Sequence, residues 1–140
     1  MSLIDTLRAH HVPFLICGAV AMAHHGYTRP TDDLDILVSP DHMQELREAL
    51  AHIIDTSDIP FDKSHDGILI RIGTPPDRVD ITTRIDGPTF AEAYTSRSGD
   101  FIGFDALLAN KLASPRPKDH RDAARLIEIL RKRAAMGLCS

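Results

Sequence analysis

Three aspartates carry the chemistry that this sequence could perform. Asp33 and Asp35 stand two residues apart in the segment D-D-L-D-I-L-V, where apolar residues alternate with them. That alternation predicts a strand, and residues two apart in a strand project from one face with Cα atoms roughly 6.5 to 7 Å apart. The two carboxylates are therefore expected to converge, while Asp32 points the other way.

Asp80 is the best candidate for a third acid in the same cluster. It lies in the segment R-V-D-I-T, which also predicts a strand. An ionised carboxylate between Val79 and Ile81, in a strand otherwise suited to burial, needs a cation or another polar partner. Hard divalent cations take oxygen ligands, commonly a few carboxylates together with substrate phosphates and water. The three acids thus predict a site for Mg²⁺ or Mn²⁺.

A D-x-D pattern alone is not specific to one chemistry. Surface strands carry acids freely, and nucleases and glycosyltransferases use the same spacing. Gly18 stands where the apolar run F-L-I-C gives way to the helix formers A-V-A-M-A-H-H, and such a glycine lets a phosphate approach backbone N–H groups at a helix start. Tight packing accounts for that glycine equally well. Only the combination of the glycine turn with the paired acids favours a phosphate-handling site.

Hydrophobic periodicity predicts an α/β fold around these residues. We expect one domain over residues 1–140, with a small mixed sheet of about four strands, helices mainly on one face, and a C-terminal helical pair framing the cleft. Strands are expected over residues 14–17, 32–38, 68–72 and 78–82, and helices over residues 2–10, 19–25, about 90–94, 105–113 and after 119.

Two of the expected helices have a predicted buried stripe. The sequence Ser39-Pro40-Asp41 has the residue types of a helix start, because a serine cap precedes a proline and an acid in the first turn. The buried stripe of that helix is expected to contain Met43, Leu46, Leu50 and Ile53. The last helix is expected to bury Ala123, Leu126, Ile127, Leu130 and Ala134.

Composition limits the classes of function. The 140 residues are 43% hydrophobic, which is enough for a real core, and 16 basic against 20 acidic residues give a net charge of −4. No global positive field is available to hold a nucleic acid, so a nucleic-acid partner would need a local basic patch.

Cysteine usage and hydropathy predict a cytoplasmic protein. Cys17 and Cys139 have no metal-ligand spacing, and reduced thiols are the plain interpretation. The first residues lack the pattern of a signal peptide, and no run approaches eighteen apolar residues. We therefore expect a chain that is neither exported nor inserted in a membrane.

One long segment resembles the signature of the DNA polymerase β-type nucleotidyltransferase superfamily: G-A-V-A-M-A-H-H-G-Y-T-R-P-T-D-D-L-D-I-L-V. It looks most like a small subgroup that includes members related to abortive-infection and toxin–antitoxin systems. The segment R-V-D-I-T is similar to the third-acid strand, and the tail L-L-A-N-K-L-A-S-P-R-P-K-D-H-R-D resembles the closing segment of that subgroup. The likeness runs from about Phe14 to Leu126.

This resemblance implies an activity and a set of roles. Asp33 and Asp35 would hold the metals, and Gly18 would shape the triphosphate loop. Asp80 would be the third ligand and would act as general base for the attacking hydroxyl, or orient it. The reaction would transfer a nucleoside monophosphate from an NTP such as ATP to a hydroxyl of a protein, an RNA or a small molecule. Ala19 departs from the pattern, because Gly or Ser usually follows the glycine; a hydroxyl contact to the phosphates is lost, although the Ala19 N–H can still donate.

Cations near the acids are further candidates for nucleotide binding. Arg29 and Thr31 lie on the loop before the first acid, and Arg29 could meet a phosphate, cap the preceding helix or pair with Asp32.

In the tail, Lys111, Arg116 and Lys118 could contact a triphosphate or an acceptor. The alternative is an ordinary solvated helix start, where Asp119 suits the helix dipole and Asp122 pairs with Arg125. The neighbouring His24 and His25 lack the spacing of a zinc site.

Two other functions remain open from the sequence. A catalytically silent nucleotide-binding or partner-binding protein, such as one half of a toxin–antitoxin pair, is favoured by Ala19 and the modest size. A D-x-D nuclease or glycosyltransferase is disfavoured by the spacing between the glycine turn and the D-L-D strand.

Overall fold

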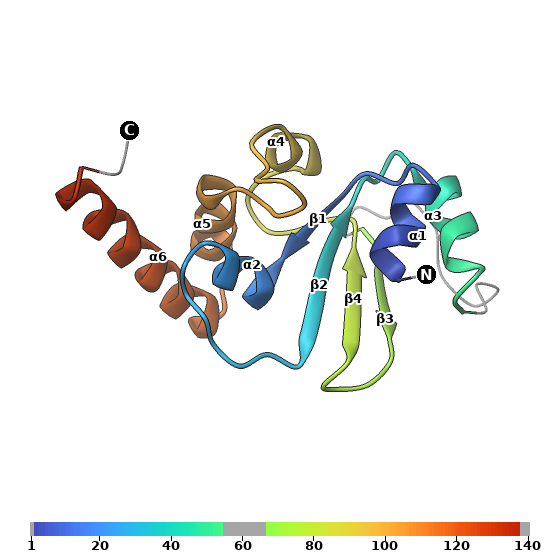
Figure 1. The fold of residues 1–140 in the computed structure, drawn as a ribbon, viewed down its shortest axis with the longest axis horizontal. Helices are drawn as coiled ribbons and strands as arrows, with labels where there is room; N and C mark the ends of the chain where they lie inside the picture. The colour runs from blue at the N-terminus through green and yellow to red at the C-terminus, as the bar shows by residue number, and fades with distance from the viewer. Residues whose placement is uncertain (1, 55–66, 138–140) are drawn as a thin grey trace.

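The computed structural model describes residues 2–54 and 67–137 as a mixed four-stranded sheet with helices on both faces (Figure 1). The strand order is β1-β2-β4-β3. The central pair β2 and β4 is parallel, and both outer pairs are antiparallel. The strands are β1 (Phe14–Cys17), β2 (Asp33–Val38), β3 (Leu69–Ile72) and β4 (Arg78–Thr82).

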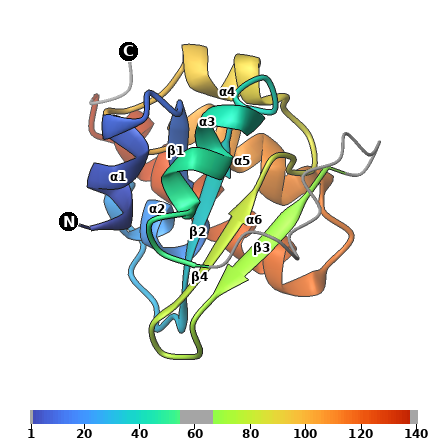
Figure 2. The ribbon, with the colours of Figure 1, turned by 90° about the vertical axis from the view of Figure 1, so that its right-hand side faces the viewer.

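The helices divide unequally between the two faces of the sheet. One face is covered by α1 (Leu3–Ala9) and α3 (Met43–Leu50), which lie in front of the strands in Figure 2. The other side carries α2 (Gly18–His24), α4 (Phe90–Thr95), α5 (Phe104–Ala113) and α6 (Pro117–Ala135). The α/β class, the mixed sheet and the C-terminal helical pair expected from the sequence are confirmed.

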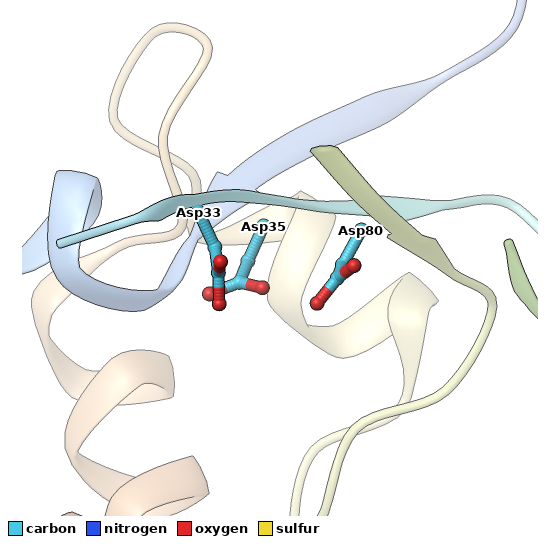
Figure 3. Close-up of side chains that lie close together, drawn as sticks. All are labelled: Asp33, Asp35 and Asp80. Carbon is cyan, nitrogen blue, oxygen red and sulfur yellow. The ribbon is translucent and has the colours of Figure 1, made fainter. Parts of the chain in front are cut away.

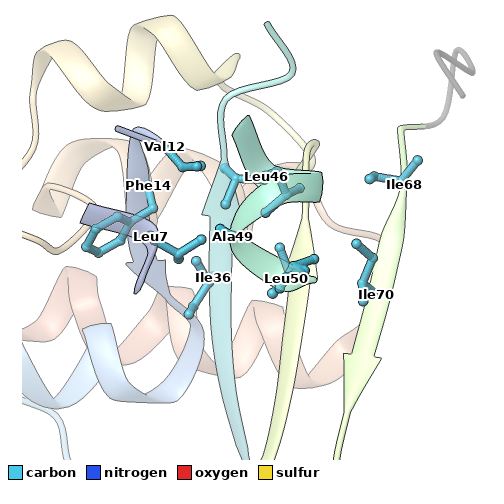
Figure 4. Packing of buried hydrophobic residues seen from close by; sticks show 11 residues of the cluster. Leu7, Val12, Phe14, Ile36, Leu46, Ala49, Leu50, Ile68 and Ile70 are labelled. Atoms are coloured by element: carbon cyan, nitrogen blue, oxygen red, sulfur yellow. The ribbon is translucent and has the colours of Figure 1, made fainter. Parts of the chain in front are cut away.

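Strand alternation decides which residues face which layer. Ile36 of β2 is fully buried against Leu7 of α1 and Leu46 and Leu50 of α3 (Figure 4). Burying such side chains stabilises the fold by about 1.5 to 3 kcal/mol each. Because neighbouring strand residues point to opposite faces, the flanking aspartates of β2 are turned toward the side of α5 and α6.

Three sequence expectations for the helices were wrong in detail. The third helix begins at Met43 after His42, not at Ser39. The Ser39 hydroxyl instead accepts a hydrogen bond from the Asp41 N–H in a turn, and such local bonds compete with helix formation. Ile53 lies beyond the end of α3 and is 41% exposed, and Ala134 is exposed near the end of α6, so neither belongs to a buried stripe.

Other local predictions are confirmed. A capping box formed by Thr89 and Glu92 starts α4, where a short helix was expected. Gly26 follows α2 with a φ of 113°, in the left-handed region that favours glycine. Cys139 lies outside the described residues.

Among the described helices, none combines the length and apolar composition needed to cross a membrane.

Candidate active site

The structure brings the three predicted aspartates together. One carboxylate oxygen from each of Asp33, Asp35 and Asp80 lies within 4.8 Å of the other two. The parallel register of β2 and β4 places Asp35 directly beside Asp80, and all three side chains point to the same side of the sheet (Figure 3). Each of these side chains is only partly buried, so the cluster is open to a ligand.

Two arginines that no sequence motif indicated balance part of this charge. Arg78 donates from Nη2 to Asp33 Oδ2 at 2.8 Å, and its Nε lies 3.4 Å from Asp80 Oδ1. The exposed Arg71 has its Nε 3.6 Å from the same Asp80 oxygen. The spacing of Arg78 and Asp80 in R-V-D could have shown that they share a face, but the pairing with Asp33 depends on strand register.

The carboxylate oxygens of this cluster suit a hard divalent cation as ligands. Asp33 Oδ1 and Asp80 Oδ1 are buried oxygens that accept no hydrogen bond from a described residue, although two arginine Nε atoms lie within ion-pair distance of Asp80 Oδ1. Burial, followed by the negative charges of Asp80 and Asp33, raises the pKa of Asp35. Clustered carboxylate oxygens that lack donors and repel each other are the ligands that Mg²⁺ prefers. Asp33, Asp35 and Asp80 are therefore the residues that would hold such an ion.

Gly18 packs directly against this cluster. Its φ is +61°, and a Cβ atom there would overlap the Asp35 carboxylate. No other residue fits this position without displacing the acid, so tight packing does require the glycine. On the neighbouring strand, burial and then the charge of Asp35 raise the pKa of Cys17 to about 12, so this residue stays a neutral thiol.

A cavity of about 390 Å³ opens over the acids. Every site residue predicted from the sequence lines it: Gly18, Ala19, Arg29, Thr31, Asp33, Asp35, Asp80, Lys111, Arg116 and Lys118. Segments separated by up to a hundred residues thus form a single pocket that contains both acids and cations.

The cations of the pocket differ in whether an acid of the protein already binds them. Arg29 forms two hydrogen bonds to Asp122, from Nε at 3.2 Å and from Nη2 at 3.0 Å. Lys111 is 5% exposed, and its Nζ lies 3.0 Å from an oxygen of both Asp119 and Asp122. Lys118 is exposed at the rim.

These contacts correct three alternatives that the sequence left open. Arg29 pairs with Asp122 and not with Asp32, and Arg125 pairs with Glu128 and not with Asp122. Lys111 is not part of a solvated helix start. Its long stem lets an ammonium group reach buried acids on the next helix, a contact that helical periodicity within α5 could not show.

The buried acids of α6 are held ionised. Burial alone would raise the pKa of Asp119, but hydrogen bonds from Ser114 and Lys111 outweigh it, and the net pKa is lowered. The pKa of Asp122 is likewise lowered against burial, by hydrogen bonds from Arg29 and Lys111. This network ties the loop before β2 to the helical pair, and so joins two walls of the pocket.

Thr31 supports the first acid through the backbone. Its hydroxyl accepts from the Asp33 N–H at 3.2 Å and donates to the Asp33 carbonyl at 3.1 Å. The histidines lie elsewhere: His24 stacks on Phe101, and His25 is buried against the Ile102 carbonyl, 2.7 Å from its Nε2. Neither takes part in a described cluster of metal-ligating residues.

The overall fold is similar to that of a solved structure. The solved structure that carries this comparison is the solution structure of the antibiotic-resistance factor ANT(2'')-Ia, with a TM-score of 0.54. The match covers 96% of this chain and 86% of that chain at 17% sequence identity, and it therefore concerns the fold. No family model matches the sequence, and no curated protein does.

Proposed function

We propose that this protein is a metal-dependent nucleotidyltransferase, which moves a nucleoside monophosphate from an NTP to a hydroxyl of an acceptor. The observation that carries the proposal is the convergence of Asp33, Asp35 and Asp80 in a pocket that is also lined by cations, among them the exposed Lys118. An anionic triphosphate suits the cations, and a divalent ion suits the acids.

In this reaction the acceptor hydroxyl oxygen attacks the α-phosphorus of the NTP. A new oxygen–phosphorus bond forms, the bond from the α-phosphorus to the bridging oxygen breaks, and pyrophosphate leaves. A bound Mg²⁺ would neutralise charge on the phosphates and lower the pKa of the attacking hydroxyl. Asp80 would orient that hydroxyl and accept its proton.

The remaining pocket residues have proposed roles in holding the nucleotide. The N–H groups of Gly18 and Ala19 would approach the phosphates, and Lys118 would contact them from the rim. Lys111 would act mainly by its charge, since its ammonium group is bound to Asp119 and Asp122. Arg29 would frame the pocket through its bond to Asp122.

Nucleotide binding should require the divalent ion, because the triphosphate and the three carboxylates repel each other without a bridging cation. Isothermal titration of the protein with each NTP is expected to give binding in Mg²⁺ or Mn²⁺ and none in chelator. Lys132→Gln, on α6 outside the pocket, serves as the control and should bind as the wild type does. Equal binding in chelator would refute the proposed site.

A silent nucleotide-binding protein is the second candidate, and Ala19 is the observation that favours it, because no hydroxyl follows Gly18. Incubation with labelled NTP and Mg²⁺, with pyrophosphate release as the readout, separates the two. Release with label on an acceptor supports transfer, and tight binding without release supports the silent alternative. Membership of a toxin–antitoxin pair is a hypothesis from the sequence resemblance, tested by co-purification of a partner protein.

A further inference from the structure

The first half of α6 separates its charges between two faces. Its acids Asp119 and Asp122 are 3% and 4% exposed and are bound to interior cations. Its bases Lys118, Arg121 and Arg125 are on the outside, and the exposed Arg116, which precedes the helix, donates to Asp119. A chain of net charge −4 therefore has a locally basic surface at this helix.

This basic surface continues directly from the active-site pocket. A second cavity of about 480 Å³ lies beside the first, and Arg29 and Lys118 line both. Tyr27, Arg121 and Arg125 line only the second. A ligand that leaves the pocket past Lys118 thus meets two more cations and an aromatic ring.

The spacing of the cations forms a line along the helix. Arg121 and Arg125 follow Lys118 by three and seven residues. This spacing places all three on one face of the helix, with a total rise of about 10 Å. Lys118 and Arg121 form no ion pair with any residue in the described ranges. Arg125 lies 5.9 Å from the Tyr27 ring and shares its charge with Glu128. Most of this charge is available to an external anion.

We propose that the acceptor is the 3′ end of a single nucleic-acid strand, whose phosphates lie along Lys118, Arg121 and Arg125. This inference rests on the proposed function. Cations that follow a line suit a ligand with regularly repeated negative charge, and an aromatic ring beside an arginine suits a stacked base. An acidic peptide offers charge but no base to stack on Tyr27. In the transfer, the terminal hydroxyl gains a nucleoside monophosphate by a new phosphodiester bond, and pyrophosphate and one proton are released.

The test measures binding of a fluorescent single-stranded RNA oligonucleotide by anisotropy at several salt concentrations. Each phosphate contact to a single strand contributes about −0.7 to the slope of log K against log salt. The double variant Arg121→Gln/Arg125→Gln should make the slope shallower by about 1.4 and weaken binding roughly 25-fold at 0.1 M salt. Tyr27→Leu should weaken binding further while leaving the slope unchanged, because stacking releases no counterion.

The matched control is Arg131→Gln/Lys132→Gln, which removes the same charge from α6 outside both cavities. This control should keep the wild-type affinity and slope. An equal loss in both double variants would mean non-specific attraction to the helix and would overturn the proposal. Binding of a polyglutamate peptide as tight as that of RNA would also overturn it.

Two further arms identify the strand and separate this inference from the proposed function. DNA of the same sequence should bind through the same cations, and extension of RNA alone would show that the 2′-hydroxyl is recognised. A 3′-phosphorylated strand should bind but receive no label. If NTP and Mg²⁺ still raise the melting temperature while no strand binds, the acceptor inference fails and the nucleotidyltransferase proposal stands. If the NTP has no effect, the proposed function itself fails.

Discussion

Asp33 and Asp35 carry the same charge in one cluster but have different surroundings. Arg78 binds Asp33 at 2.8 Å, whereas Asp35 forms no ion pair with a described residue, and burial raises its pKa. Two carboxylates about 5 Å apart repel by roughly 3 kcal/mol at an effective dielectric of 20. The free energy of unfolding therefore depends on which of the two charges is removed.

Asp35→Asn is expected to raise the free energy of unfolding in chelator by about 1 kcal/mol, after relaxation and solvent reduce the repulsion. Asp33→Asn is the matched control and should give no gain, because it also removes the partner of Arg78. Both variants should lose the stabilisation by Mg²⁺ and NTP. Thermal melts with chelator and with Mg²⁺ plus NTP measure both effects.

The direction in which stability changes with pH follows from the raised pKa of Asp35. The folded state keeps this proton to higher pH than the unfolded state, so stability falls as pH rises from about 3.8 through the folded pKa. The increase in the free energy of unfolding caused by Asp35→Asn should thus be present at neutral pH and disappear in acid. Destabilisation of Asp35→Asn in chelator, with an intact Mg²⁺ response, would contradict the assignment of the site.

At the scale of elements, the buried Lys111 of α5 holds the two acids of α6. Lys111→Met should destabilise the fold by about 3 kcal/mol, because breaking a buried ion pair leaves an uncompensated charge. Lys118→Met, at the exposed start of α6, should change the free energy of unfolding little. Urea unfolding of both variants measures the difference, and equal stabilities would show that the buried network contributes nothing.

The network also has an expected response to acid. The pKa values of Asp119 and Asp122 are lowered, so the unfolded state binds more protons than the folded state below about pH 3.8. Their stabilisation is therefore complete above that pH and is lost as pH falls through the folded values. Lys111→Met should show a weaker loss of stability over this acid range than the wild type does.

Local patterns in the sequence were enough to predict the elements and the acids. Alternation identified β2 and β4, and the D-x-D spacing placed Asp33 and Asp35 on one face. The contacts between distant segments could not be predicted, because they depend on the pairing register and on helix docking. Arg78 binds an acid 45 residues away, and Arg29 binds one 93 residues away. Ser39 also shows that a good capping residue can serve a turn instead.

At the scale of the whole molecule, the pocket is built from both halves of the chain. The sheet supplies the acids and the C-terminal pair supplies Lys111 and Lys118. If residues 1–140 form one domain, thermal unfolding should show a single transition whose midpoint is the same by near-UV and far-UV circular dichroism. Mg²⁺ with NTP at 100 times its Kd should stabilise that transition by about 2.7 kcal/mol. Two separate transitions, with only one sensitive to ligand, would contradict the single-domain prediction.

The division of charges on α6 has a consequence for how this protein can change over generations. The acids Asp119 and Asp122 anchor the helix from its inner face, whereas Lys118 and Arg121 form no ion pair with a described residue. Substitutions at Lys118, Arg121 or Arg125 therefore cost the fold little. A lineage can exchange these outer side chains one at a time, and so present a different surface to ligands, while the acids of the sheet stay as they are.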